Sequence, residues 1–336
     1  MLDLLYDGLL GLLNTPFDFG VRFSLFYIAG TILIAFVIWH HRKEDTSFLA
    51  WLLPKSVYRH KSNILDIKLF IVNRLLSTTG LFGALVFGPF VAFWTAGLLN
   101  GDVLPINAQV AVTWQTALFV TFLLLVSKDF CKYWSHRIMH EWKVLWPFHS
   151  VHHSAEVLTP LTVVRSHPMD LIFRNLVTNL VVGVIQGIVL FSFVGEVGLI
   201  TIGGANIFVF FVNFLTANFR HSHIWISFGP VVEHILVSPA QHQIHHSTAV
   251  EHHDKNYGSL FAIWDWAFGT LYIPRRREEL TLGLSDADGT LIAQPHETLR
   301  KALFSPFVAS LRSIRLRRSE PPPRQDERWE ENSRTK

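Results

Sequence analysis

Apolar residues run through this chain in five long stretches that contain no Asp, Glu, Lys or Arg. The stretches cover residues 23–39, 75–101, 103–127, 175–195 and 197–219. A helix needs about 20 apolar residues to cross a bilayer, so the first stretch is at the short end and the others are long enough. Helices buried in a large soluble protein are the alternative, but five such stretches would need an unusually large core. The pattern predicts an all-α, polytopic membrane protein with about five transmembrane helices.

Basic residues gather between the stretches in an uneven way. Lys and Arg are frequent in residues 40–74, 128–174 and 220–336, whereas the two remaining connectors hold only Asp102 and Glu196. Because Lys and Arg accumulate on the cytoplasmic side of membrane proteins, we expect the N-terminus outside and all three basic segments, including the C-terminus, inside. Basic residues placed by topology give no reason to expect a nucleic-acid partner.

Composition narrows the class further. Charged residues make up 16% of the 336-residue chain, hydrophobic residues make up 50%, and Cys131 is the only cysteine. An overall disordered or coiled-coil chain is therefore excluded. A single cysteine also excludes an internal disulfide framework and a cluster held by several cysteines.

The same patterns predict four regions. Residues 1–127 would hold the N-terminal transmembrane helices and a basic inside loop, and residues 128–274 a catalytic region with two further spans. Residues 275–318 form a basic C-terminal segment, of which 300–318 interleave Leu and Phe with Arg. This part could lie on the anionic inner membrane surface or form a solvated charged helix. Residues 319–336 contain three consecutive prolines and are expected to be disordered.

Histidines supply the candidate chemistry. The chain has 18 of them, and most gather in two of the segments expected inside. The first segment holds an H-x-x-x-H box and then an H-x-x-H-H-S box, and the second repeats H-x-x-H-H-S about ninety residues later. The box histidines are His136, His140, His149, His152, His153, His242, His245 and His246.

These spacings have a geometric meaning on a helix. Residues at i, i+3 and i+4 share a face, so His136 and His140 present two imidazoles to one point. Adjacent histidines diverge by about 100° of helix rotation, which suits two different metal ions. Ser238, Pro239 and Gln241 predict a capped helix start just before the last box.

A metal site is the interpretation that best explains these clusters, because imidazoles buried together need partners. Imidazole suits zinc, copper, iron and nickel, so the metal stays open at this point. Eight nitrogens exceed one coordination sphere, which implies two ions. A zinc hydrolase would more commonly use three ligands, and a bis-histidine haem needs only one axial pair.

The three boxes resemble those of the fatty acid hydroxylase/sterol desaturase superfamily of integral membrane proteins. Flanking residues extend the resemblance over about residues 129–270. They are Tyr133-Trp134-Ser135 before the first box, Trp146-Pro147-Phe148 before the second, Arg165-Ser166-His167-Pro168, Asn256-Tyr257-Gly258, and the run from Trp264 to Thr270.

The resemblance implies a di-iron, oxygen-dependent enzyme that hydroxylates or desaturates a lipid, with a sterol-like or acyl-chain substrate. It makes the eight box histidines the iron ligands and catalytic residues, and adds His221 as a ninth ligand. At the position of His223 the family often has Asn, which leaves the role of His223 open. Zinc could replace iron in purified protein, because imidazole binds both.

Further polar residues near the boxes are candidates for contacts to the ligands. Asp129 either orients a ligand or pairs with Lys132, and His167 either supports the site or caps a helix. His253 and Asp254 either contact ligands or lie in a solvated loop.

The sequence shows no dinucleotide-binding fingerprint after a strand, no Cys cluster and no P-loop. We therefore expect electrons from a separate, cytochrome b5-like or ferredoxin-like protein. A histidine-rich metal transporter or sensor is the alternative function, but its ligands should lie at mid-membrane depth, and the five apolar stretches contain no histidine. A lipid-binding protein with a structural metal is a third hypothesis. The substrate and the oligomeric state stay open.

Overall fold

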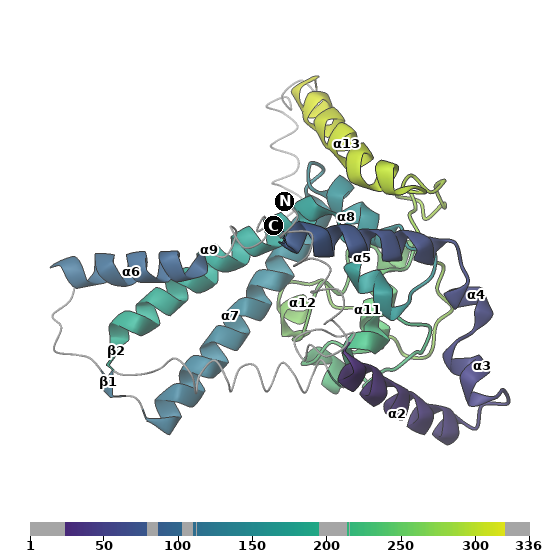
Figure 1. Ribbon diagram of the computed structural model, residues 1–336, viewed down its shortest axis with the longest axis horizontal. Coiled ribbons are helices and arrows are strands. Elements are labelled where there is room, and N and C mark those ends of the chain that lie inside the picture. The colour runs from purple at the N-terminus through teal and green to yellow at the C-terminus, as the bar shows by residue number, and fades with distance from the viewer. Residues whose placement is uncertain are drawn as a thin grey trace, which may run out of the picture.

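The computed structural model describes residues 24–78, 87–102, 110–111, 113–194, 214 and 216–319. Within these residues the chain is mostly helical. The α-helices are α2 (Leu25–Arg42), α3 (Phe48–Leu52), α4 (Lys55–Tyr58), α5 (Ser62–Thr78), α6 (Gly88–Asp102), α7 (Trp114–Glu141), α8 (Trp146–His153), α9 (Pro168–Ser192), α11 (Pro239–His245), α12 (Ile263–Ala267) and α13 (Leu299–Ser319). The 3₁₀ helices are η3 (Pro160–Val164), η4 (Val232–His234) and η5 (Val250–His252). Helices α6, α7 and α9 extend away from a cap of shorter helices and loops (Figure 1).

Three of the described helices are long and apolar enough to cross a membrane: α2, α7 and α9. They overlap the first, third and fourth predicted stretches. The second stretch corresponds to the end of α5 and to α6, whose apolar part is shorter. The fifth stretch lies largely outside the described residues. The polytopic all-α class is confirmed, whereas the number of about five spans stays a prediction.

Helices α6 and α9 pack closely because α9 carries small residues at their contact. A Cβ atom added at Gly183 would lie 2.9 Å from the carbonyl oxygen of Gly88, and one at Gly187 would lie 2.5 Å from that of Ala92. Glycines four residues apart are a common device by which apolar helices approach each other in membranes. At their far ends, β1 (Val110–Ala111) and β2 (Phe193–Val194) form a two-residue parallel pair.

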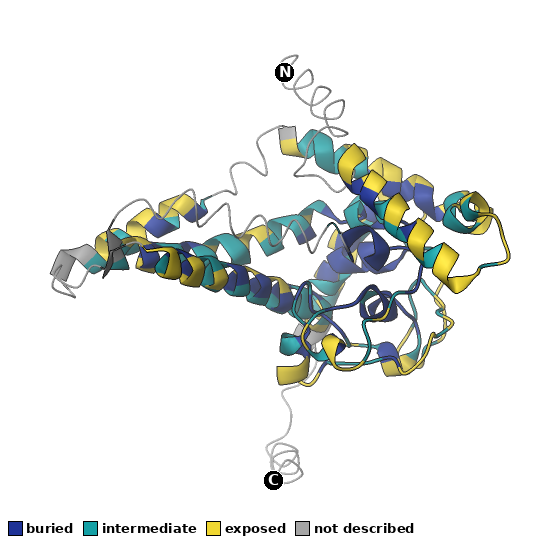
Figure 2. Ribbon diagram, turned by 90° about the horizontal axis from the view of Figure 1, so that it is seen from below, coloured by how far each residue is buried: buried dark blue, intermediate teal, exposed yellow. Residues whose placement is uncertain are grey.

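The outer faces of these long helices are apolar. Large hydrophobic side chains such as Phe119 and Phe122 on α7 and Leu180 and Ile188 on α9 are exposed. Exposed residues recur along the extended helices, whereas the chain around α8 and α11 is largely buried (Figure 2). Exposed apolar rows on long helices match a lipid environment, because hydrocarbon solvates them and water does not.

The cap holds the histidine boxes on short, well-capped helices. Ser238 caps α11 by accepting a hydrogen bond from the backbone N–H of Gln241, whose side chain accepts one from the N–H of Ser238. Pro239 occupies the first turn, so the predicted helix start is confirmed. The chain after residue 274 stays in contact with the cap, since Thr248 bonds to Thr281 and the backbone of Ser247 bridges to Leu282. The predicted region boundary at 274 stays a prediction, and residues 320–336 of the expected disordered tail lie outside the described residues.

Candidate metal centre

Nine histidines from four parts of the chain lie close together inside the cap. His136 and His140 come from the C-terminal end of α7, and the second box from α8. His221 follows a short helical segment at 216–220, and the third box lies on α11 and its C-cap. All nine are the histidines that the sequence and its resemblance single out. They fall into two groups, in each of which one ring nitrogen per residue lies within 4.8 Å of the others.

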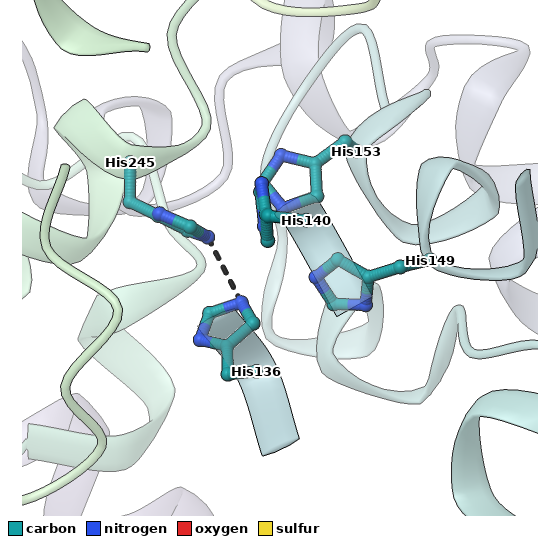
Figure 3. A group of neighbouring side chains, drawn as sticks. All are labelled: His136, His140, His149, His153 and His245. Atoms are coloured by element: carbon teal, nitrogen blue, oxygen red, sulfur yellow. Dashed lines mark hydrogen bonds between the residues drawn. The ribbon is translucent and has the colours of Figure 1, made fainter. Parts of the chain in front are cut away.

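The first group, here named cluster A, contains His136, His140, His149, His153 and His245 (Figure 3). The i, i+4 pair on α7 brings the rings of His136 and His140 to a centroid distance of 5.1 Å, as the helical spacing predicts. The Nε2 atoms of His136 and His245 lie 3.0 Å apart, although 109 residues separate them in the sequence.

The proton positions in cluster A leave lone pairs directed at one another. Nδ1 of His136 lies 2.8 Å from the carbonyl oxygen of Tyr257, and Nδ1 of His245 lies 2.7 Å from that of Lys255. A carbonyl only accepts, so both Nδ1 atoms carry the proton and both Nε2 atoms carry a lone pair when the rings are neutral. Two lone pairs 3.0 Å apart repel each other, and a cation bound by both removes that repulsion.

The second group, cluster B, contains His152, His221, His242 and His246. Nε2 of His221 lies 3.2 Å from Nε2 of His152, 3.1 Å from that of His246 and 3.0 Å from that of His242. A single ring nitrogen offers one proton or one lone pair, so it cannot satisfy three neighbours by hydrogen bonding. Separations near 3 Å are expected for nitrogens that share one metal ion at about 2.0–2.1 Å.

Burial keeps these imidazoles neutral. It lowers the pKa of His152, His153, His242 and His246 well below the usual value, and the neighbouring histidines lower it further. Burial also lowers the pKa of His245 to about 3. Neutral imidazole is the form that binds a metal.

The donor set fits metal ions of intermediate softness. Nε2 of His140, Nε2 of His153 and both ring nitrogens of His149 are buried without a hydrogen bond among the described residues. Such orphaned nitrogens are costly unless a metal or another partner takes their lone pairs. Five and four imidazoles are ligands that iron, zinc, copper and nickel accept. The residues therefore fit two metal ions, one for each cluster.

Tyr257, which lies between the third histidine box and α12, contacts two histidines of cluster A. Its ring lies with centroids 5.0 Å from His140 and 5.7 Å from His136, and its carbonyl accepts the proton of His136 Nδ1. Its hydroxyl donates to Asp254 Oδ1 at 2.8 Å. Asp254 thus reaches the ligands through Tyr257, and it holds a left-handed backbone conformation with φ of 57°.

Asp170 supports cluster A from the first turn of α9. Its Oδ1 lies 3.7 Å from Nδ1 of His149, and its Oδ2 accepts a 2.7 Å bond from Arg174. At 3.7 Å this is a charge contact and not a hydrogen bond, and it places a carboxylate beside the outer nitrogen of a metal-binding candidate, the usual second partner of a metal-bound histidine. The sequence patterns did not single out Asp170 as a site residue. Its signal was its place three residues after His167, in the element that follows the second box.

Arg165 holds the helix that carries the second box. The buried guanidinium donates to the carbonyl oxygens of Val151 and Ser154 near the C-terminal end of α8. It also donates to Asp66 Oδ1 at 2.9 Å and to Ser62 on α5. The arginine thus satisfies carbonyls that the end of a helix leaves without partners.

The remaining candidates near the boxes have partners of their own. Asp129 accepts hydrogen bonds of 3.0 Å from the backbone N–H groups of Leu260 and Phe261 and from the indole of Trp264. It therefore joins the segment 260–264 to α7. His167 accepts the N–H of Met169 at the start of α9.

Two others contact the backbone of neighbouring segments. Nε2 of His223 lies 2.8 Å from the carbonyl of Trp51. Nε2 of His253 lies 3.1 Å from the carbonyl of Thr248 and 3.1 Å from Oγ of Ser285. Both histidines therefore link the cap to adjacent parts of the chain.

Comparison with known proteins gives a consistent result. Residues 121–270 match the family model described as fatty acid hydroxylase. Ornithine lipid hydroxylase OlsE of Rhizobium tropici is 30% identical over 187 residues, which cover 54% of this chain and 51% of that protein. Alkylglycerol monooxygenase of Danio rerio is 30% identical over 179 residues, covering 53% and 35%. A putative Delta(7)-sterol-C5(6)-desaturase 2 of Arabidopsis thaliana is 29% identical over 171 residues, covering 48% and 51%.

The chain thus spans about half the length, or less, of these curated relatives. No solved structure matches it. The relatives are named as a lipid hydroxylase, a monooxygenase and a desaturase, and the apolar helices of this chain indicate an integral membrane protein. Residues 121–270 thus match the fatty acid hydroxylase family, and the relatives that resemble this chain are of the fatty acid hydroxylase/sterol desaturase superfamily.

Proposed function

We propose that this protein is a di-iron, oxygen-dependent enzyme that hydroxylates or desaturates a membrane lipid. The observation that carries the proposal is that nine buried or half-buried histidines form two clusters whose only ligand atoms are nitrogens. Each of the adjacent pairs His152/His153 and His245/His246 places one ring in cluster A and the other in cluster B. A single structural metal would need one such cluster. Two neighbouring clusters on a chain whose relatives are of this superfamily favour a redox pair.

Iron bound in both clusters would supply oxygen activation and removal of hydrogen from an unactivated C–H bond. Hydroxylation consumes one O₂, two electrons and two protons, and it places one oxygen atom in the alcohol and the other in water. Desaturation uses the same inputs, removes two hydrogens from the lipid and releases two waters. Both reactions therefore need an external reductant.

The protein residues hold and shield the site. Eight of the nine histidines present their ring from short cap elements or the end of α7, while Asp170 and the carbonyls of Lys255 and Tyr257 face the outer nitrogens of three of them. Most of the cluster residues are buried, which keeps bulk water away from the reacting groups. His136 and His140 lie at the C-terminal end of α7, so a lipid that packs along that end of the helix would lie near cluster A.

A separate carrier protein is proposed as the electron source. The sequence contains no nicotinamide or flavin fingerprint, and the two clusters use only imidazole. A cytochrome b5-like or ferredoxin-like protein would deliver electrons one at a time from the cytoplasmic side, where we place the histidine boxes and the C-terminus, with the N-terminus outside.

Polar-headed lipids are the substrate class to test first. The relatives named as an ornithine lipid hydroxylase and as alkylglycerol monooxygenases both act, by their names, on lipids with a polar head. Sterols and very-long-chain aldehydes follow, since relatives are named for these as well.

The test is isotope incorporation by iron-loaded protein in lipid. The assay supplies lipid extract, a reductase with its carrier, and ¹⁸O₂, and mass spectrometry follows the lipids. We expect a labelled hydroxylated lipid, or an unsaturated lipid formed with oxygen consumption. His140→Ala and His245→Ala should abolish the product, while His41→Ala, at an exposed position on α2, should retain it. If the iron-loaded wild type consumes no oxygen over a broad lipid panel, the protein is a lipid- or metal-binding protein and the proposal is wrong.

A further inference from the structure

Helix α13 has one face packed on the cap and one face exposed. Leu299, Ala302 and Leu303 pack against Leu65 and Leu69 of α5, together with Val151 of α8. The opposite face is apolar in its middle, where Phe304 is 63% exposed, Val308 50% and Leu311 58%. If this second face were in contact with water, its apolar side chains would contribute nothing to stability.

Basic residues surround the exposed apolar face. Arg300 and Lys301 precede it, Arg312 and Arg315 follow it, and all four are exposed. The helix contains no acidic residue. Glu297, two residues before it, pairs with Lys301 at 2.9 Å, and Glu320 follows its last residue in the sequence. An apolar strip with flanking Lys and Arg is the pattern of a helix that lies in an anionic membrane surface.

Contacts with His167 hold α13 next to the start of α9. Nδ1 of His167 accepts the N–H of Met169, so Nε2 carries the proton and donates to the carbonyl of Leu303 at 3.0 Å. The ring of His167 also lies 5.4 Å from that of Phe307. His167 immediately precedes α9, which is one of the three helices long and apolar enough to cross a membrane.

A proline lies within one turn of this contact. Pro306 lies inside α13 and has no N–H, so the carbonyl of Ala302 does not receive the usual helical hydrogen bond. The His167 imidazole bonds to the next carbonyl, that of Leu303, and this bond joins α13 to the start of α9.

The neighbouring helix repeats the pattern. On α5, Ile64, Ile67 and Ile71 recur at helical spacing and are exposed, and Lys61 and Lys68 beside them are exposed as well. Because α5 packs against α13 through Leu65 and Leu69, two amphipathic helices lie together beside the start of α9.

We propose that α13 lies in the plane of the membrane, with Phe304, Val308 and Leu311 among the upper acyl chains and the flanking basic residues on anionic phospholipid headgroups. The occupant of the exposed face is thus the lipid surface itself. An acidic carrier protein would complement the charges, but it would leave three large apolar side chains in the centre without apolar partners. The proposal concerns anchoring of the cap and is independent of the metal chemistry.

The test measures the depth of spin labels on the full-length protein in nanodiscs. Cys131 is buried and is replaced by Ala, and single cysteines are introduced by Phe304→Cys, Val308→Cys and Leu311→Cys, with Asp288→Cys in an exposed cap loop as control. We expect the three α13 labels to collide with O₂ and to be protected from a water-soluble nickel complex. The control label should show the reverse.

Lipid composition tests the charge part of the proposal. Discs of phosphatidylcholine with phosphatidylglycerol should bury the labels more deeply than phosphatidylcholine alone, and Arg312→Gln with Arg315→Gln should remove that difference. Equal burial in both lipids would overturn the anionic preference. Full nickel access at all three positions would overturn the membrane placement, as would protection that appears only at high protein concentration or after an acidic carrier is added.

Discussion

The rings of His152 and His153 stand at 89° to each other, with centroids 5.6 Å apart, and enter different clusters. His245 and His246 do the same at 80° and 5.6 Å. In both pairs the step of about 100° between adjacent helical residues separates the rings. One H-x-x-H-H box can therefore supply ligands to two metal sites from a single turn of helix.

Asp170→Asn should weaken metal binding without unfolding the protein. The amide keeps the size of the side chain but loses the charge that faces Nδ1 of His149 at 3.7 Å. Losses of this kind typically cost 10–100-fold in metal affinity or activity. Competition with a chelator of known affinity measures the effect, and Asp288→Asn on the exposed loop serves as control. Equal affinity in Asp170→Asn and wild type would show that the carboxylate does not act on the ligand.

Replacement of Arg165 should destabilise α8 and with it both clusters. Arg165→Met leaves Asp66 as an uncompensated buried charge, a change that usually costs about 3–5 kcal/mol. Arg165→Lys should recover only part of this loss, because an ammonium cannot reach Val151, Ser154 and Ser62 at once. Thermal unfolding in detergent, together with metal content, checks the expected order of stability: wild type highest, then Arg165→Lys, then Arg165→Met. A methionine variant as stable as wild type would contradict it.

Two variants of Tyr257 should differ in their effect. Tyr257→Phe removes only the 2.8 Å hydrogen bond to Asp254, so we expect a loss of about 1 kcal/mol in stability and normal metal content. Tyr257→Ala removes the ring beside His136 and His140 and opens the site to water, so metal content and activity should both fall. Metal analysis and unfolding curves on both variants provide the measurement. Loss of metal in Tyr257→Phe would assign the hydroxyl a larger role than the geometry gives it.

Acid should loosen the contact between α8 and the C-terminal segment. Burial, with repulsion from Arg165 and His167, lowers the pKa of His296 to about 4, and its ring bridges Ser150 and Ser305. In the unfolded chain His296 binds a proton more readily than in the folded protein. The neutral, buried ring therefore contributes its full stabilisation of the folded state above about pH 6.5, and this contribution is lost as the pH falls toward 4. At pH 5 the loss should be about 2 kcal/mol. Unfolding curves at pH 7.5 and pH 5 should show a smaller difference for His296→Gln than for wild type, and an equal difference would contradict the prediction.

The ligand residues could be predicted from the sequence because they follow local rules. His136 and His140 share a helix face at i, i+4, and the capped start of α11 was visible in Ser238, Pro239 and Gln241. The apolar stretches likewise located α2, α7 and α9. The stretch at 75–101 is predicted as one span, and the structure describes its two ends, in α5 up to Thr78 and in α6 from Gly88.

The resemblance includes Tyr257 and Arg165, but the contacts that these supporting residues make could not be predicted, since they join distant parts of the chain. Tyr257 meets His136 across 121 residues, and Arg165 meets Asp66 across 99. Each of these residues has an ordinary local explanation, such as a turn, a helix start or a surface charge. Only the folded arrangement shows that they orient the histidines or hold their helices.

Counting metal ions in the intact protein tests the central claim most directly. Native mass spectrometry of iron-loaded wild type should show two ions per chain. His149→Ala removes a ligand from cluster A alone and His242→Ala from cluster B alone, so each variant should lose one ion preferentially and keep the other. His41→Ala should keep both. One ion in the wild type, or complete loss of both ions in each single variant while the protein stays folded, would contradict the account of two separate histidine sites.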